Sequence, residues 1–255
     1  MNDSTSTISP VWPTSWPKDS FRPWPTALVF GAILAAFIVV LLLGVGWLAV
    51  CCRPALFARD MNVLLMPSLV FQGFGDLAVA AVVITQLPQL SGFPPRAIGL
   101  AVPNSSQVLT AVLGAVVMTI VVQSSSAVIE KLAHTTHQEE AVALFRSLHN
   151  PTQIAIFIFF ATIVAPIGEE ALFRLFAFNA FLRYTSGFWP AAIASGILFG
   201  ALHTDVYAFL PLALAGIVLA GVYYRTRNAF TSMITHGLFN AVPLVLLAFF
   251  PKLAN

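Results

Sequence analysis

Residues 151–184 read PTQIAIFIFFATIVAPIGEEALFRLFAFNAFLRY, an apolar stretch whose charged residues all lie in its second half. An α-helix rises about 1.5 Å per residue, so about 20 apolar residues cross a hydrocarbon layer of roughly 30 Å. The stretch is long enough for one crossing, or for two short ones if residues 166–168 divide it. The sequence therefore predicts membrane-spanning helix here.

Similar apolar runs fill most of the chain. They cover residues 27–50, 63–87, 108–129, 188–202, 206–224 and 229–250. Of the 255 residues, 58% are hydrophobic and only 9% are charged, whereas about a quarter of the residues of a soluble domain are charged. We therefore expect an all-α fold, a polytopic transmembrane bundle of about eight helices in the plasma membrane. A net charge of +2 without a dense basic run argues against nucleic acid as a partner.

The chain divides by composition into three parts. Residues 1–26 are rich in Pro, Ser and Thr and predict a disordered tail. The run 27–50 follows no basic start or small-residue cleavage site, so we expect a retained helix rather than a signal peptide. Residues 27–150 then hold the N-terminal transmembrane helices and residues 151–250 a second bundle. Cys51 and Cys52 fit a helix end better than lipidation, a disulfide or a metal site.

Residues 130–150 are polar with apolar residues at roughly helical spacing, which predicts an amphipathic helix on the membrane surface. His134, His137 and His149 lie in this segment. They lack the close pair spacing of metal ligands, so a solvated polar face is a better interpretation than a metal site.

The Lys and Arg residues of the loops predict the orientation in the membrane. Eight spans, with residues 166–168 dividing two short crossings and the N-terminus outside, place most of the basic residues in the cytoplasm. The cytoplasmic set is Arg53, Arg59, Lys131, Arg146, Arg183, Arg225 and Arg227, and the outer set is Lys18, Arg22, Arg96 and Lys252. A single crossing there gives a nearly even split, so eight spans are favoured.

Several polar side chains interrupt the apolar runs. They are Asp76, Glu169, Glu170, Arg174, His203, Asp205, His236 and Asn240. A charge at the centre of a membrane helix costs on the order of 3 kcal/mol on insertion scales. All of these residues except Asp76 lie in the C-terminal part of the chain, and this concentration predicts a functional site.

Helical spacing groups these residues by face. Glu170 and Arg174 are four residues apart and predict an intrahelical ion pair, whereas Glu169 is rotated about 100° away and is left without a cation. Phe199 with His203, and His236 with Asn240, have the same spacing. If these faces converge, a carboxylate, two imidazoles and an amide share one pocket, which suits hydrolysis by an activated water.

Structural roles compete with this interpretation. A Glu–Arg pair commonly stabilises a helix, and a single buried histidine often only fills space. Asp205 fits an N-cap for the helix that follows it. Asp76 lies next to Gly75 and suits either a pocket or a polar contact between helices, and the sequence does not decide between them.

Three motifs carry a resemblance to a known family. They are EExxxR at residues 169–174, FxxxH at residues 199–203 and HxxxN at residues 236–240. With the segments that flank them, roughly residues 151–245 resemble the CPBP family of intramembrane proteases, also called the CAAX protease, bacteriocin-processing or Abi family. Its eukaryotic member is the type II CAAX prenyl endopeptidase. Leu175 departs from the Gly that many members have after the arginine.

The resemblance implies roles for individual residues. Glu169 and His203 would activate water, while His236 and Asn240 would bind the oxyanion. Glu170, Arg174 and Phe199 would support them. Residues 151–250 would then form the catalytic bundle. The family is often described as metalloproteases; a glutamate mechanism with no cofactor is favoured here, although Glu169, His203 and His236 could hold zinc.

We thus expect a membrane-embedded endopeptidase that cleaves a peptide or lipid-modified protein near the membrane surface. A catalytically silent membrane scaffold or a bacteriocin self-immunity protein on the same fold is the alternative, which the complete set of polar residues disfavours. A proton-coupled transporter would also use intramembrane acids. It predicts an inverted repeat, which the sequence does not show.

Overall fold

The computed structural model describes Gly46 and residues 62–91, 94–136, 140–185, 187–203 and 205–249. Over these residues the chain is built of helices and turns, without a β-strand. The predicted tail, nearly all of the run 27–50, and Cys51 and Cys52 lie outside the described residues. The α-helices are α3 (Asn62–Ser91), α4 (Ser105–Ala133), α5 (Glu140–Ser147), α6 (Pro151–Phe159), α7 (Ala165–Glu170), α8 (Asn179–Tyr184), α9 (Phe188–Leu202), α10 (Phe209–Thr226) and α11 (Ala229–Phe249). A short 3₁₀ turn, η1 (Pro95–Ile98), follows α3.

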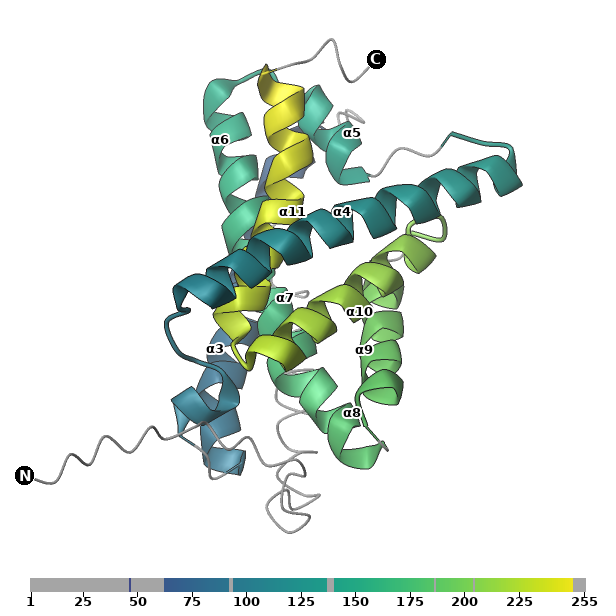
Figure 1. Cartoon of the computed structure of the whole chain (residues 1–255). Helices are drawn as coiled ribbons and strands as arrows, with labels where there is room; N and C mark the ends of the chain where they lie inside the picture. Colours follow the sequence, from purple (N-terminus) through teal and green to yellow (C-terminus); the bar gives the residue numbers. More distant parts are fainter. Residues whose placement is uncertain are drawn as a thin grey trace, which may run out of the picture.

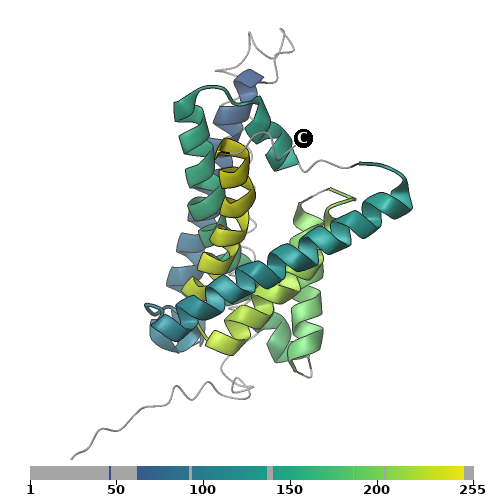
Figure 2. The same ribbon diagram turned by 45° about the horizontal axis from the view of Figure 1, so that its top comes forward.

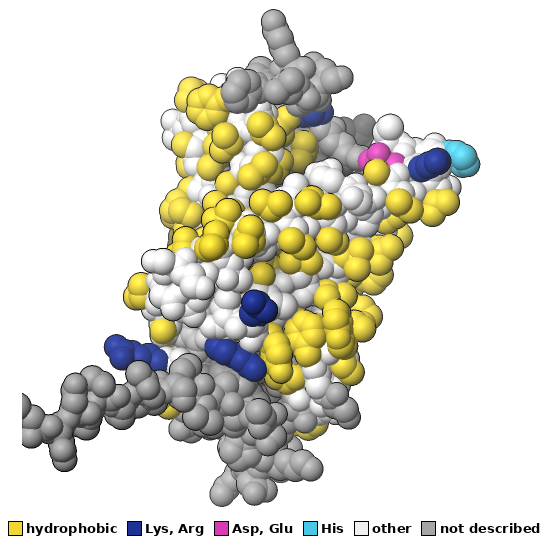
Figure 3. Space-filling model, viewed as in Figure 1, with side chains coloured by type: hydrophobic (Ala, Val, Ile, Leu, Met, Phe, Trp, Pro, Cys, Tyr) yellow, Lys and Arg dark blue, Asp and Glu magenta, His cyan; other side chains and the backbone are white. Residues whose placement is uncertain are grey.

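Five helical segments of the described chain are long and apolar enough to span a membrane. They are Leu69–Gln89, Ser105–Ala133, Pro151–Leu182, Phe209–Thr226 and Ala229–Phe249. Many of their large apolar side chains face outward, and in Figure 3 they form a broad yellow area with few charged groups. Such a surface suits lipid better than water. The chain is therefore a multi-pass membrane protein, and the predicted all-α membrane bundle is confirmed.

Residues 151–182 form one continuous helical span, so the predicted division into two short crossings is wrong. Two wider π-helical segments, η2 (Phe160–Val164) and η3 (Ala171–Phe178), lie within it and flank α7. Pro166 stands in the first turn of α7, directly after η2. In a π turn the backbone hydrogen bonds span five residues instead of four. The helix can therefore continue through Pro166, which has no N–H to donate.

The single span also corrects the predicted sides of three arginines. The amide of Ala229 donates to the carbonyl of Gly99 at 2.8 Å, and the side chain of Asn228 donates to the carbonyl of Ala101 at 2.7 Å. The loop after α3, which carries Arg96, thus lies against the loop after α10, which carries Arg225 and Arg227. These arginines share one end of the molecule, whereas the eight-span arrangement separated them.

The polar segment 130–150 does not form one amphipathic helix. Helix α4 continues to Ala133 and ends at His134, which adopts a left-handed conformation. Helix α5 then begins at Glu140 and buries Phe145 against Phe157 of α6. His134 and His149 are exposed, in line with the expected solvated face, while His137 lies outside the described residues.

The helices surround α7, which lies near the centre of the bundle (Figure 1). Helix α3 packs on α7, α11 packs on both α7 and η2, and α4 crosses α10 and α11 on one side. Figure 2 shows the same crossing of α4 over α10 and α11 from another direction. Small residues allow the closest contacts: a Cβ on Gly196 of α9 would lie 2.5 Å from the carbonyl oxygen of Ala213 in α10. The arrangement brings α3, α7, α9 and α11 to one central region.

Candidate active site

Glu170 lies at the end of α7 with its side chain fully buried. Its Oε1 is 2.9 Å from Nη1 of Arg174, which confirms the ion pair predicted from their spacing. Its Oε2 accepts a hydrogen bond of 2.7 Å from the Ser232 hydroxyl in α11. Its Oε1 also lies 3.1 Å from Nδ1 of His236. Glu170 therefore connects α7 to α11 through both of its carboxylate oxygens, whereas the sequence predicted only its ion pair with Arg174.

Arg174 is fully buried beside this carboxylate. Its Nη2 donates to the carbonyl of Gly216 in α10 at 3.2 Å. The guanidinium carbon lies 4.8 Å from the ring centre of Phe199 and 5.7 Å from that of Phe173. Aromatic faces attract a cation, and the effect is larger away from water. Phe199 of the second motif thus supports Arg174 of the first.

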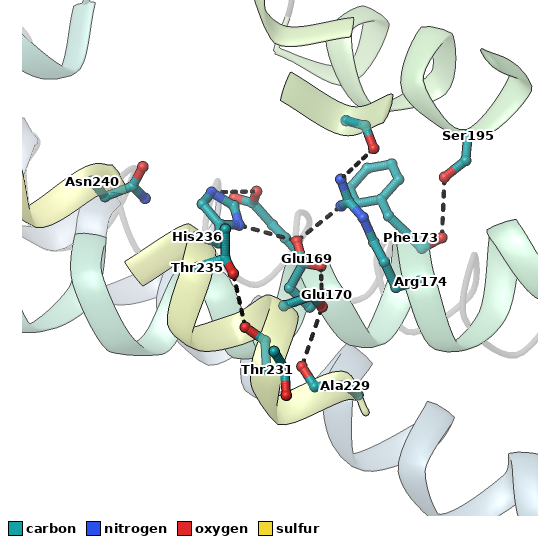
Figure 4. Close-up of polar contacts among 12 residues, drawn as sticks. Glu169, Glu170, Phe173, Arg174, Ser195, Ala229, Thr231, Thr235, His236 and Asn240 are labelled. Carbon is teal, nitrogen blue, oxygen red and sulfur yellow. Dashed lines mark hydrogen bonds and ion pairs between the residues drawn. The ribbon is translucent and has the colours of Figure 1, made fainter. Parts of the chain in front are cut away.

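His236 contacts both glutamates, one through each ring nitrogen (Figure 4). Its Nδ1 faces Glu170, and its Nε2 lies 3.8 Å from Oε2 of Glu169. That oxygen of Glu169 is buried and has no hydrogen-bond partner among the described residues. A carboxylate only accepts hydrogen bonds, so the contact with Glu170 places a proton on Nδ1 of His236, and Nε2 is the ring nitrogen that faces Glu169. The predicted separation of roles, with Glu170 paired and Glu169 without a strong partner, fits this geometry.

His203 closes α9 with an exposed ring. Its Nδ1 lies 2.7 Å from the carbonyl oxygen of Phe199. A carbonyl only accepts, so this contact places the proton on Nδ1 and leaves Nε2 as the basic nitrogen. The Phe199 ring lies between the histidines, with its centre 4.8 Å from His203 and 5.8 Å from His236. The ring of Phe199 therefore connects His203 to the buried residues of the site.

Asn240 lies one turn beyond His236 on α11, apart from the carboxylates in Figure 4. Its Nδ2 donates to the carbonyl of Ala161 in η2 at 2.8 Å. Gly237, on the same face, lets α11 approach the carbonyl oxygen of Thr162. One N–H of the Asn240 amide therefore bonds to a backbone carbonyl of the π-helical segment η2. An amide has two such donors, and the second could serve the predicted oxyanion.

Asp76 joins the site from α3, which the sequence left undecided. Gly168, the residue before Glu169, lies directly against the backbone of Asp76. The sequence signal for Asp76 was an acidic residue within an apolar run. Its contact, Gly168, lies some 90 residues away on another helix, and helical spacing predicts only contacts within one helix. Ser232 gave no such signal, because a serine in a membrane helix is common.

The prediction that Asp205 is the N-cap of the helix that follows is wrong, because the N-cap of α10 is Ala208 and no side chain caps that helix. Oδ1 of Asp205 accepts hydrogen bonds from the amides of Tyr207 at 2.9 Å and Ala208 at 3.2 Å. These amides belong to the turn that leads into α10. Asp205 thus organises the loop after His203.

The donor atoms do not form a zinc site as they stand. No three His, Cys, Asp or Glu side chains of the described residues are grouped as metal ligands. Nδ1 of His236 faces Glu170 and Nδ1 of His203 faces a backbone carbonyl, which leaves Nε2 as the available donor atom of each ring. A tetrahedral zinc site needs three such groups converging on one point. The grouping of the described residues therefore gives no support for a zinc site.

Comparison with known proteins places the matched segment over this site. Residues 151–242 match the family model of type II CAAX prenyl endopeptidase Rce1-like proteins. YdiL of Bacillus subtilis (strain 168) is 29% identical over 93 residues, which cover 36% of this chain and 38% of YdiL. The membrane-embedded CAAX protease MroQ of Staphylococcus aureus (strain USA300) is 29% identical over 99 residues, covering 36% of this chain and 40% of MroQ.

The UPF0177 protein YaiF of Lactococcus lactis is also similar, at 28% identity over 110 residues that cover 43% of this chain and 47% of YaiF. The matches thus span less than half of these relatives. No solved structure matches the chain. The matched segment contains all three motifs and lies within a multi-pass membrane bundle. Residues 151–242, less than half of the chain, are thus similar to Rce1-like type II CAAX prenyl endopeptidases, and the predicted resemblance is confirmed.

Proposed function

We propose that this chain is an endopeptidase of the plasma membrane that hydrolyses peptide bonds with a water activated by Glu169. One observation carries the proposal: the buried Oε2 of Glu169 has no hydrogen-bond partner among the described residues and lies 3.8 Å from Nε2 of His236. An acceptor held out of contact with the surrounding protein is available to a water molecule. A general base must lie within hydrogen-bond reach of the proton that it removes.

The chemistry follows from the contacts of each residue. Glu169 takes a proton from water while the oxygen of that water attacks the peptide carbonyl. Nε2 of His203, left basic by the Nδ1 contact, assists in holding the water. The proton then passes to the leaving amine nitrogen, so no other reactant is required. His236, held by Glu170, and the second amide donor of Asn240 stabilise the oxyanion.

The substrate class rests on position in the membrane and on the named relatives. Glu169 and His236 lie on helices that span the bilayer, so a substrate must reach them from the membrane or its surface. MroQ is named a CAAX protease, and a C-terminal CAAX sequence begins with a cysteine that receives a prenyl lipid. We propose a membrane-associated peptide, including a lipid-modified one, as the substrate.

The direct test is cleavage of a defined set of bacterial membrane proteins and prenylated peptides in lipid vesicles, read by mass spectrometry. The parent should produce new peptide ends that Glu169→Ala does not produce. His149→Gln is the matched control, because His149 is exposed and precedes the same continuous span that carries Glu169. Identical fragments from the parent and Glu169→Ala would contradict the proposal, and no cleavage at all would favour a silent scaffold.

Metal removal gives a separate prediction. If Glu169 and His203 activate water without a metal, thorough chelation should leave cleavage nearly unchanged. The purified protein should then hold well below one zinc per chain, as measured by elemental mass spectrometry. A zinc site made of Glu169, His203 and His236 would instead lose activity on chelation, because the metal would generate the nucleophile. Recovery with zinc, but not with magnesium, would overturn the metal-free mechanism.

A further inference from the structure

Three arginines that belong to none of the three motifs lie at one end of the molecule. They are Arg96 in the loop after α3, and Arg225 and Arg227 where α10 ends. Arg96 and Arg225 are exposed, and Arg227 is partly buried. In Figure 3 the Lys and Arg side chains of this end are dark blue groups with no Asp or Glu among them.

The acidic side chains that the structure describes lie elsewhere. They are Glu130 in the last turn of α4, Asp205 in the loop before α10, and Asp76, Glu169 and Glu170 within spans. Helix α4 begins beside the arginines and α10 ends among them, so Glu130 and Asp205 lie at the far ends of these helices. The described part of the arginine end therefore has a net positive charge.

Hydrogen bonds between the two loops hold the arginines on one folded surface. In addition to the two bonds described above between these loops, Nε2 of Gln107 in α4 donates to the carbonyl of Thr226 at 2.9 Å. The guanidinium carbon of Arg227 lies 4.0 Å from the centre of the Tyr224 ring, which restricts this side chain. The positive charges are therefore held together by the packing of α4 and α10.

Aromatic side chains indicate that this surface lies at the depth of the lipid headgroups. The rings of Tyr224 and Phe188 have centres 5.0 Å apart, and those of Phe188 and Trp189 have centres 5.1 Å apart. Trp189 is 66% exposed. Exposed tryptophan and tyrosine are typical of the interface between membrane and water. Because helices α3 and α10 end here and α4 and α11 begin here, the arginines lie where lipid phosphates are found.

We propose that Arg96, Arg225 and Arg227 form a binding surface for the headgroups of anionic phospholipids. A guanidinium presents planar N–H donors that match phosphate oxygens, and it stays charged at physiological pH. Phosphatidylcholine has the same phosphate next to a choline cation, so a surface with net positive charge favours a lipid that lacks this cation. The inference does not depend on the proposed function, because lipid binding here requires no peptidase activity.

Native mass spectrometry of the purified full chain, in detergent with equal amounts of phosphatidylglycerol and phosphatidylcholine, measures the preference. The parent should retain more phosphatidylglycerol. Arg96→Gln/Arg225→Gln should lower the ratio of the two bound lipids at least about fivefold, the scale of the attraction of one basic residue to an anionic membrane surface. Both side chains are exposed, so the variant should fold, and circular dichroism checks this.

Two control variants separate a phosphate surface from a general effect of charge. Arg96→Lys/Arg225→Lys keeps both cations and should retain most of the preference. Lys131→Gln removes an exposed cation at the other end of α4 and should leave the ratio unchanged. An unchanged ratio in Arg96→Gln/Arg225→Gln, or an equal loss in Lys131→Gln, would overturn the proposal.

A competition measurement distinguishes the lipid from a free anion. Sodium phosphate and sodium chloride at equal ionic strength should weaken the binding of phosphatidylglycerol to the parent equally, because both act by screening. A selective loss in sodium phosphate would identify inorganic phosphate as the occupant of the surface and would also overturn the proposal.

Discussion

Replacing Glu169 with glutamine should lower kcat at least about 100-fold and leave KM nearly unchanged. Glutamine keeps the size of the side chain but cannot take a proton, and general base catalysis contributes about 10²–10⁴-fold. Folding should survive, because the buried Oε2 of Glu169 makes no hydrogen bond to the described protein that could be lost. We expect the thermal midpoint in detergent to stay equal to that of the parent or to rise.

A combined measurement of turnover and stability makes this prediction specific. A structural glutamate would lose stability and activity together on replacement, whereas a general base loses activity alone. Glu169→Asp is the matched variant: it keeps the acid but retracts it by one methylene, so activity should fall less than in Glu169→Gln. Turnover by Glu169→Gln equal to that of the parent would end the interpretation as a hydrolase.

Local spacing predicted the parts of the site that lie on one helix. The Glu170–Arg174 ion pair follows from positions four residues apart, and the structure contains it at 2.9 Å. Phe199 and His203 likewise share one face, with their ring centres 4.8 Å apart. Such contacts depend only on the geometry of a single helix, which every α-helix shares.

Contacts between helices were beyond prediction from spacing. Asp76 lies directly against Gly168, because glycine lacks the side chain that would keep α3 away. Nothing in the order of residues states which apolar helix packs against which. The same limit applies to Asn240, whose donor to Ala161 serves a π-helical segment that hydropathy does not reveal.

The error at residues 166–168 has a clear physical source. Proline and glycine together usually end a helix, so two short crossings were expected. The π turn of η2 directly before Pro166 lets one helix continue. Because an added crossing reverses every later loop, this local error also moved Arg225 and Arg227 to the wrong side of the membrane relative to Arg96.

Replacing Glu170 with glutamine should have the opposite profile, a large loss of stability. Arg174 would remain fully buried with its charge uncompensated, and removing one partner of a buried ion pair costs about 3–5 kcal/mol. The Nη2 contact to the Gly216 carbonyl would remain but cannot balance a charge. Unfolding of the purified protein in mixed detergent, followed by circular dichroism, should show the lower midpoint.

The double variant Glu170→Gln/Arg174→Met tests whether stability falls because Arg174 is left buried without a counter-charge or because the ion pair itself is lost. It removes the buried cation as well, so most of the stability lost in Glu170→Gln should return, and the two single changes should not add. Activity should stay low in the double variant, because His236 has lost the carboxylate that faces its Nδ1 at 3.1 Å. If Glu170→Gln unfolds within about 0.5 kcal/mol of the parent, the size of a change at an uncoupled surface site, the ion pair does not hold this part of the bundle together.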